Sequence, residues 1–279
     1  MEGIPLFSIS PNPATMYLTP ALKAAVARFK RAIARKQGLC LILGGVGLGK
    51  STLLRHVAGN YELDEEHYSV SYLHDSRKLK SSFDFLKVVS EDFEIKPRRS
   101  QIAQMGAIEE YLIKNYELNK TTIVCIDEAQ RLPLETLELI RSLLNLETDT
   151  HKLIQVIAAG QLELRERLLK PQYEAFRSRI VAPLVMEPLK AAETAKMIQA
   201  RLESWQVDNP FSPEAITEIH RLSNGVPREI LLLCQGACDQ AAGPEETPTR
   251  SVTADDVLRA YQDLQLTDQV QPEAEAVLA

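Results

Sequence analysis

The residues best suited to chemistry lie between positions 44 and 52, where glycines stand close to a lysine and two hydroxyl side chains. They follow an apolar run, residues 39–43, that is typical of a strand buried on both faces. Glycines let the backbone turn tightly and bring its N–H groups to phosphate oxygens, which a Cβ would obstruct. The segment predicts a loop that wraps a polyphosphate, with contacts from Gly44, Gly45, Val46, Gly47, Leu48, Gly49, Lys50, Ser51 and Thr52.

The side chains at the end of this loop have distinct expected roles. Lys50 supplies a mobile positive charge for the β- and γ-phosphates, whereas Ser51 opens the next helix and places its hydroxyl on Mg²⁺. A glycine-rich turn that fits the pattern by accident is the alternative. The strand before the loop and the helical run of residues 52–58 after it favour the phosphate loop.

A second candidate site follows residues 121–126, an apolar run with β-branched residues that ends in Asp127 and Glu128. Two adjacent carboxylates are costly to pack there unless the strand tip faces a polar site. Asp127 would accept hydrogen bonds from the water shell of Mg²⁺, and Glu128 would polarise the water that attacks the γ-phosphate. A solvent-facing strand end is the alternative. Gln161, after a further buried strand, either senses the γ-phosphate and its lytic water or caps a helix.

Composition limits the class of protein. A chain of 279 residues with 45% hydrophobic and 25% charged residues suits a soluble protein with one large α/β domain and a smaller one. No apolar run approaches the ~20 residues of a membrane helix, and the N-terminus lacks a basic region followed by an apolar core, so we expect a cytoplasmic protein. The four cysteines, Cys40, Cys125, Cys234 and Cys238, are expected to be core side chains, with a metal site at Cys234 and Cys238 as the alternative.

Hydrophobic periodicity predicts an α/β part with a five-stranded parallel sheet, followed by an all-helical part. We place the nucleotide-binding α/β domain at residues 1–187, a helical lid domain at 188–266 and a loose tail at 267–279. Strands are expected at 39–43, 68–73, 121–126, 153–159 and 182–186, and helices at 20–36, 52–58, 81–93, 101–116, 134–146, 191–205, 213–222, 228–241 and 254–264.

Basic residues gather in two segments between the second and third expected strands. Such clusters are usually solvated loops, although the net charge of −6 does not exclude a local basic groove for nucleic acid. The candidate nucleic-acid contacts are Arg77, Lys78, Lys80, Arg98 and Arg99.

Taken together, the phosphate loop, the Asp-Glu strand end, the five alternating strands and the helical lid resemble the AAA+ ATPases, which are P-loop NTPases. Shorter motifs are similar to those of the ExeA-type ATPases of the general secretion pathway and of the TnsC and TniB regulators of DNA transposition. These motifs are Tyr17-Leu18-Thr19-Pro20, the segment 142–149, Gly160-Gln161-xx-Leu164, Ser178-Arg179-Ile180 and Gly225-Val226-Pro227-Arg228.

The resemblance implies Mg²⁺-dependent ATP hydrolysis, with Gln161 as sensor 1 and Arg228 as sensor 2, the latter on a lid that closes over ATP. It places Arg179 at the arginine finger, which reaches the nucleotide of a neighbouring subunit. A homo-oligomer, either a ring or a helical filament with ATP at each interface, follows from it. Arg177 is a rival for the finger, and an ordinary salt bridge is the alternative for either arginine.

Two functions fit this resemblance. One is a soluble, DNA-binding switch that recruits a transposase or recombinase, which the lack of a membrane segment and cell-wall-binding region favours. The other is a secretion or pilus assembly ATPase acting through a membrane component, which the acidic charge balance favours. A protein that binds ATP but scarcely hydrolyses it is a third hypothesis, and Glu128 argues against it.

Overall fold

The computed structural model describes residues 6–10, 12–74, 76, 79–242 and 250–269. These residues form two compact units. The first comprises Leu18–Val46 and Lys50–Glu187, and the second comprises residues 188–242 and 250–269, the described part of residues 6–17 and the loop residues Gly47–Gly49.

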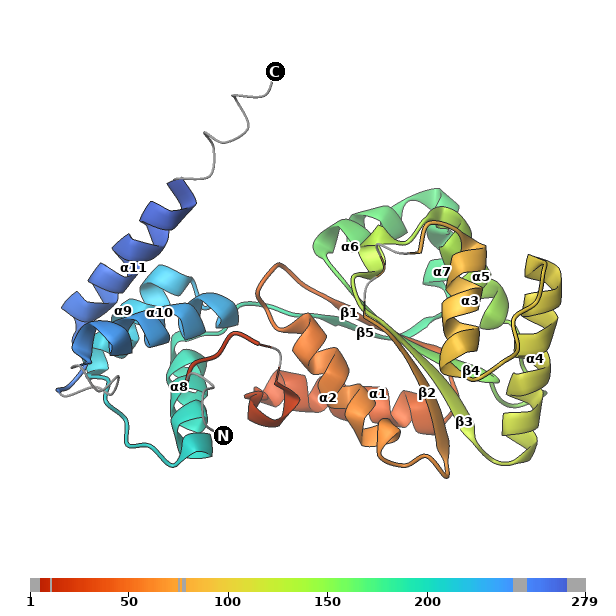
Figure 1. Ribbon diagram of the computed structural model, residues 1–279, viewed down its shortest axis with the longest axis horizontal. Coiled ribbons are helices and arrows are strands. Elements are labelled where there is room, and N and C mark those ends of the chain that lie inside the picture. The colour runs from red at the N-terminus through yellow and green to blue at the C-terminus, as the bar shows by residue number, and fades with distance from the viewer. Residues whose placement is uncertain (1–5, 11, 75, 77–78, 243–249, 270–279) are drawn as a thin grey trace, which may run out of the picture. The chain divides into compact units, whose positions relative to one another are not determined.

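The first unit is built on a five-stranded parallel sheet in the order β2-β3-β4-β1-β5 (Figure 1). The α/β fold predicted from the sequence is therefore confirmed. The residues of β1 and β4 are all buried, and those of β3 nearly so, because these strands lie inside the sheet and are covered on both faces. The strands are β1 (Leu39–Leu43), β2 (Tyr68–Leu73), β3 (Thr121–Ile126), β4 (Ile154–Gly160) and β5 (Ile180–Val185).

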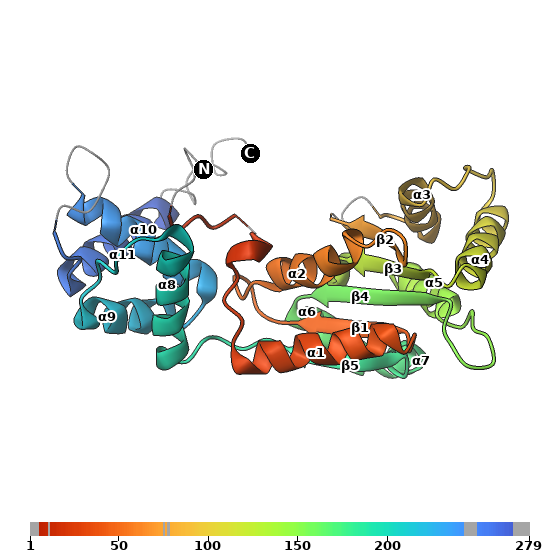
Figure 2. The same cartoon turned by 90° about the horizontal axis from the view of Figure 1, so that it is seen from below.

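Helices cover both faces of this sheet. The helices α1 (Pro20–Ala34) and α2 (Lys50–Glu62) lie against one face, as Figures 1 and 2 show. The opposite face packs against α3 (Ser82–Asp92), α4 (Gln101–Glu117), α5 (Leu134–Leu143), α6 (Leu162–Leu169) and α7 (Glu174–Arg177).

Caps fix where several of these helices begin. The Thr19 hydroxyl accepts from the Leu22 N–H, and Pro20 is the first residue of α1. Ser81 forms a capping box with Asp84 at the start of α3. Short 3₁₀ turns complete the chain path at η1 (Pro13–Thr15), η3 (Ala129–Arg131) and η4 (Pro171–Tyr173).

The second unit packs α8 (Ala191–Trp205), α9 (Pro213–Ser223), α10 (Pro227–Ala241) and α11 (Ala254–Gln269) around an apolar core. Phe7 is buried in this core, where its ring contacts that of Phe211 at 5.7 Å between centroids. Arg201 also donates to the Thr15 hydroxyl at 2.6 Å. The N-terminal segment thus belongs to the helical unit, although the sequence analysis assigned it to the α/β domain. The physical reason is that burying the apolar Phe7 side chain in this core is more favourable in free energy than leaving it in solvent.

The end of the chain differs from the prediction as well. The helix α11 continues to Gln269, so the first three residues of the predicted loose tail, 267–269, are helical. The remaining residues of that tail lie outside the described part of the chain.

The cysteines occupy the core, as predicted. All four, Cys40, Cys125, Cys234 and Cys238, are buried and unpaired, and burial raises the pKa of the Cys40 and Cys238 thiols to about 12. In the described residues, no group of three or more His, Cys, Asp and Glu side chains could hold a metal ion, so the metal site at Cys234 and Cys238 has no further ligands there. Within the same residues, no helix combines the length and the apolar character that crossing a membrane requires.

One ion pair fixes the start of α11. The buried Asp256 carboxylate accepts from both terminal nitrogens of Arg250, at 2.6 and 2.7 Å, and from the N–H and hydroxyl of Thr253. The Arg250 guanidinium, followed by the Thr253 donors, holds the pKa of Asp256 well below its usual range, against the opposing effect of burial. Because the pKa is lower in the folded state, this interaction stabilises the fold above the unfolded pKa of about 4 and is lost as the pH falls further.

We therefore expect Asp256→Asn to lower the free energy of unfolding by about 2 kcal/mol at pH 7, because it removes a buried charge that is fully hydrogen-bonded. The difference from the wild type should narrow below about pH 4. Denaturant unfolding followed by circular dichroism measures both effects, with the exposed neighbour Asp255→Asn as the matched control. Equal unfolding of the two variants at pH 7 would contradict the assignment.

Candidate functional site

The loop between β1 and α2 has the backbone conformation expected of an anion-binding turn. Gly47 and Gly49 have φ angles of 78° and 88°, in the left-handed region that favours glycine. The helix α2 begins at Lys50, so the N–H groups of its first turn have no carbonyl one turn earlier to bind. Free N–H donors next to such a turn fit a polyphosphate group.

Lys50 lies buried at the end of this loop, only 7% exposed, with its Nζ donating to the Gly45 carbonyl at 2.8 Å. Burial lowers the pKa of Lys50, while the charges of Glu128, Asp127 and Glu163 raise it in part. The lysine of the loop and the carboxylates at the end of β3 therefore lie close enough to interact electrostatically. The fold brings together two motifs that are almost 80 residues apart in sequence.

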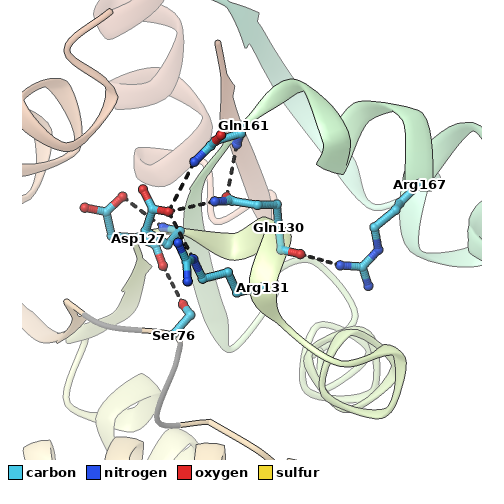
Figure 3. Close-up of polar contacts among 7 residues, drawn as sticks. Ser76, Asp127, Gln130, Arg131, Gln161 and Arg167 are labelled. Carbon is cyan, nitrogen blue, oxygen red and sulfur yellow. Dashed lines mark hydrogen bonds and ion pairs between the residues drawn. The ribbon is translucent and has the colours of Figure 1, made fainter. Parts of the chain in front are cut away.

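Asp127 follows β3 directly and is 6% exposed. Its N–H donates to the Leu73 carbonyl at 3.0 Å, its Oδ1 accepts from the Glu128 N–H at 2.9 Å, and its carbonyl accepts from the Ser76 hydroxyl (Figure 3). No lysine or arginine of the described chain forms an ion pair with this carboxylate. A buried carboxylate without an ion-pair partner among the described residues fits Mg²⁺, which takes hard oxygen ligands, and the Ser51 hydroxyl at the start of α2 is of the same kind.

Glu128 adopts a left-handed conformation with φ of 56° at the start of η3. One oxygen of its carboxylate, Oε2, accepts from Gln130 Nε2 at 2.7 Å, from Arg131 Nε at 3.4 Å and from Gln161 Nε2 at 3.5 Å (Figure 3). A non-glycine residue in this region costs on the order of 1 kcal/mol, and such strain is most often kept at functional sites. The contacts fix a half-buried carboxylate at the tip of the sheet.

Gln161 occupies the cap position of α6, but its side chain makes no capping hydrogen bond. It points instead toward Glu128, and its N–H donates to Gln130 Oε1 at 3.1 Å (Figure 3). Of the two interpretations drawn from the sequence, the geometry favours a residue beside the carboxylate over a helix cap. Its action as a γ-phosphate sensor stays a prediction.

Gln130 and Arg167 belong to this site but were not singled out from the sequence. Gln130 joins Glu128 to Gln161, and Arg167 donates to the carbonyls of Gln130 and Leu132, the latter at 2.9 Å. The sequence did offer a signal for Gln130, because it stands two residues after the candidate catalytic Glu128 and so belongs to the same turn. Arg167 had none, since the backbone carbonyls that it binds lie more than 30 residues away along the chain.

The two candidate finger arginines lie at the other edge of the sheet. Both precede β5, and Leu39 at the start of β1 pairs with Ile180, whereas the phosphate loop follows the end of β1 at Leu43. Four residue steps along a strand correspond to about 13 Å. Neither arginine is therefore beside the loop of its own chain.

The two arginines differ in their contacts. Arg177 Nη1 donates to the Leu168 carbonyl at 2.8 Å, so its guanidinium is engaged within the chain. The Nε of Arg179 is buried and has no partner among the described residues. This difference favours Arg179 as the residue that contacts another molecule, although the finger role of either arginine stays a prediction.

The remaining candidate residues differ in their distance from the phosphate loop. Arg228 is the second residue of α10, and its N–H donates to the Gly47 carbonyl of the loop at 3.2 Å, within the same compact unit. The role of its side chain at the nucleotide stays a prediction. Arg77 and Lys78 lie outside the described residues. Lys80, Arg98 and Arg99 are exposed, and the Arg98 N–H donates to Oε1 of the buried Gln104 at 2.6 Å.

Comparison with known proteins supports the fold that these features indicate. Residues 33–168 match a family model described as an AAA domain. Similar solved structures include ORC2 of Aeropyrum pernix with ADPNP and ADP (TM-score 0.64, 16% identity, 95% of this chain and 73% of that chain). A point mutant of RuvB of Thermotoga maritima has a TM-score of 0.58 with 19% identity over 88% of this chain and 71% of that chain. The fold is that of the AAA+ P-loop NTPases.

Two curated relatives are similar in sequence. General secretion pathway protein A of Aeromonas hydrophila is 32% identical over 236 residues, which make up 84% of this chain and 42% of that protein. An uncharacterized HTH-type transcriptional regulator of Methanocaldococcus jannaschii is 32% identical over 135 residues, 45% of this chain and 32% of that protein. The chain thus spans less than half the length of either relative. Both similarities are consistent with the AAA+ fold.

We expect Gln130→Ala to lower ATP turnover about tenfold, the effect of losing one hydrogen bond to a charged group, while ATP affinity stays unchanged. The variant removes a donor from Glu128 and an acceptor from the Gln161 N–H, but no contact with the phosphate loop. Steady-state phosphate release and equilibrium ATP binding measure the two quantities, with the exposed Gln262→Ala as control. Weaker ATP binding with unchanged turnover would contradict this assignment.

Proposed function

We propose that this protein is a Mg²⁺-dependent ATPase. The observation that carries the proposal is the convergence of a buried lysine on the phosphate loop, Lys50, with the carboxylates of Asp127 and Glu128 at the tip of β3. A buried lysine that is coupled electrostatically to one buried and one half-buried carboxylate, beside free backbone N–H groups, suits a triphosphate with its metal ion. The AAA domain match over residues 33–168 supports the same activity.

The residues divide the work as follows. Backbone N–H groups of residues 44–49 bind and orient the phosphates, and Lys50 places its charge at the β- and γ-phosphates. Ser51 and Asp127 would hold Mg²⁺, which when bound stabilises the charge that develops on the transferring phosphoryl group. Glu128 takes the proton of the attacking water, and its bonds to Gln130 and Gln161 keep its carboxylate at the strand tip.

Two substitutions test this assignment. We expect Lys50→Ala to abolish ATP binding, because it removes the cation that balances the phosphates, and Glu128→Gln to bind ATP normally but lose at least about a hundredfold in turnover, because an amide cannot accept the proton. Fluorescent-nucleotide binding and phosphate release measure both. Normal ATP affinity in Lys50→Ala, or full turnover in Glu128→Gln, would overturn the proposed function.

We further propose that ATP is hydrolysed between copies of the chain, in a ring or a helical filament. Arg179 supports this, because it lies at the opposite edge of the sheet from its own loop and carries a buried donor without a partner among the described residues. A guanidinium from a second copy would offset the negative charge on the γ-phosphate. Arg228 is proposed to approach the same phosphates from the helical unit, and the cytoplasm, where ATP is available, is the proposed location.

The proposed partner is duplex DNA, with the protein acting as a switch that recruits a transposase or recombinase. The supporting observation is the set of exposed basic residues around α3 and α4, Lys80, Arg98 and Arg99. The buried Gln104 binds the Arg98 N–H and donates to the Ser90 hydroxyl at 2.8 Å, which gives the loop before α4 a fixed backbone. The ORC1 protein of Aeropyrum pernix, solved in complex with DNA, has a related fold with a TM-score of 0.64 and 15% identity over 93% of this chain and 69% of that chain.

A role in secretion or pilus assembly, through a membrane component, is the second candidate. The similarity to general secretion pathway protein A favours it, since that relative covers most of this chain. The acidic net charge of −6 also limits how much of the surface can face DNA. The two candidates differ in the partner they require, so a binding experiment separates them.

We expect the wild-type protein with ATP to bind duplex DNA with an affinity that falls steeply as salt rises, because phosphate contacts release counterions. The double variant Arg98→Glu, Arg99→Glu should weaken binding and reduce the slope of log affinity against log salt by about two, one for each lost contact. Filter binding at several salt concentrations measures this, with the exposed Arg165→Glu as control. Absent or salt-independent binding would reject DNA as the partner and favour the secretion role, for which co-purification with a membrane protein is the test.

A further inference from the structure

Arg167 binds the turn that carries Glu128 through two backbone carbonyls. Its Nη1 donates to the Gln130 carbonyl (Figure 3), and its Nη2 donates to the Leu132 carbonyl at 2.9 Å. Among the described residues, no backbone N–H donates to either carbonyl, so the guanidinium is their donor. Because the planar guanidinium presents several N–H groups in a fixed fork, one side chain ties both carbonyls to α6.

Tyr173 holds this guanidinium in its orientation. The Tyr173 hydroxyl accepts from Arg167 Nη2 at 3.4 Å, and the guanidinium carbon lies 5.6 Å from the centroid of the ring. The tyrosine is only 5% exposed and belongs to the apolar core of the first unit, so packing sets the position of its ring. Arg167 forms no ion pair within the described chain. Its direction is therefore set by the core and not by a carboxylate.

Gln130 links the bound turn to the Glu128 carboxylate. Its Nε2 donates to Glu128 Oε2 at 2.7 Å, the shortest of the three contacts on that oxygen, and its Oε1 accepts from the Gln161 N–H at 3.1 Å. Gln130 is thus held at its backbone by Arg167 and at its side chain by Glu128 and Gln161. Since the φ of 56° at Glu128 is unfavourable for a residue with a side chain, the turn needs such restraints.

We propose that Arg167 is a positioning residue for Glu128: by holding the backbone of Gln130, it keeps the Glu128 carboxylate in place to take the proton of the attacking water. This inference rests on the proposed function, in which Glu128 is the base. A displacement of about 1 Å in a catalytic group can cost on the order of a hundredfold in rate. The partners of Arg167 are two carbonyls and a hydroxyl, so its removal changes turnover and not ATP binding.

A purely structural arginine is the alternative, one that anchors α6 to the turn without any effect on the chemistry. Its removal would reduce the fraction of folded chains, but each folded chain would hydrolyse ATP at the normal rate. A positioning residue differs, because its effect depends on the carboxylate that it positions. Replacing Glu128 therefore separates the two roles.

The test is Arg167→Gln in the wild-type and in the Glu128→Gln background. In the wild type we expect turnover per folded chain to fall at least about tenfold with ATP affinity unchanged, because glutamine is too short to bind both carbonyls. In the Glu128→Gln background we expect the residual turnover to change less than about twofold, since no carboxylate is left to position. Phosphate release and fluorescent-nucleotide binding measure these quantities, and thermal unfolding gives the folded fraction. Arg165→Gln, an exposed arginine of the same helix, is the matched control.

Two milder variants keep the test valid if Arg167→Gln folds poorly. Arg167→Lys keeps the charge without the fork and should retain more turnover than Arg167→Gln. Tyr173→Phe keeps the buried ring and removes only the hydroxyl, so we expect a loss of about threefold in the wild type and none in the Glu128→Gln background.

The outcomes distinguish this inference from the proposal beneath it. Unchanged turnover in Arg167→Gln, weaker ATP binding as its main effect, or an equal loss in both backgrounds would overturn the role of Arg167. The same loss for Tyr173→Phe in both backgrounds would also count against it. Full turnover in Glu128→Gln alone would instead reject the proposed function itself, because the carboxylate would then not be the base.

Discussion

The burial of two opposite charges at one edge of the sheet constrains the rest of the structure. Lys50 and Asp127 are each less than 10% exposed, and a buried ion is costly unless another charge or a full set of hydrogen bonds accompanies it. The order β3-β4-β1 places the ends of β3 and β1 on either side of β4, with their carboxyl ends at the same edge. Because parallel strands share their direction, the two charges meet wherever these strands are paired in register.

The tip of β4 shows how closely the elements approach there. A Cβ at Gly160 would lie 2.7 Å from Leu164 Cδ2 and 3.4 Å from the Gln130 N, so a larger residue would push η3 away from the sheet. Arg167 bonds two carbonyls of the same segment, at Gln130 and Leu132. These contacts oppose the strain of the left-handed Glu128, since a turn held from both sides has few other conformations available. The backbone that carries the carboxylate at the strand tip is therefore held by packing at Gly160 and by the Arg167 guanidinium.

Much of this could be predicted from the sequence, because the buried strands are continuous apolar runs and the phosphate loop has a fixed spacing. The ends of helices were harder to predict. The helix predicted over 134–146 ends at Leu143, where the chain turns toward residues 147–152, which precede β4. The placement of Phe7 depends on a core made by helices about 190 or more residues later, and no local pattern reports it. The contacts of Arg167 could not be predicted either, since the sequence does not distinguish an arginine that binds backbone carbonyls from one that points into solvent.

The same sheet that brings Lys50 and Asp127 together keeps Arg179 away from them. A parallel strand cannot be shortened without losing its hydrogen bonds, so the loop after Leu43 and the arginine before Ile180 stay separated by the length of β1. An arginine at that end of the strands, with a buried donor that has no partner among the described residues, does not lie beside the phosphate loop of its own chain. In the proposed assembly, this arginine would contact the nucleotide of a second copy, because a symmetric assembly would present that nucleotide with the same geometry at every interface. The rigidity that brings Lys50 and Asp127 together is thus the physical reason that, in the proposed assembly, the arginine would come from another copy of the chain.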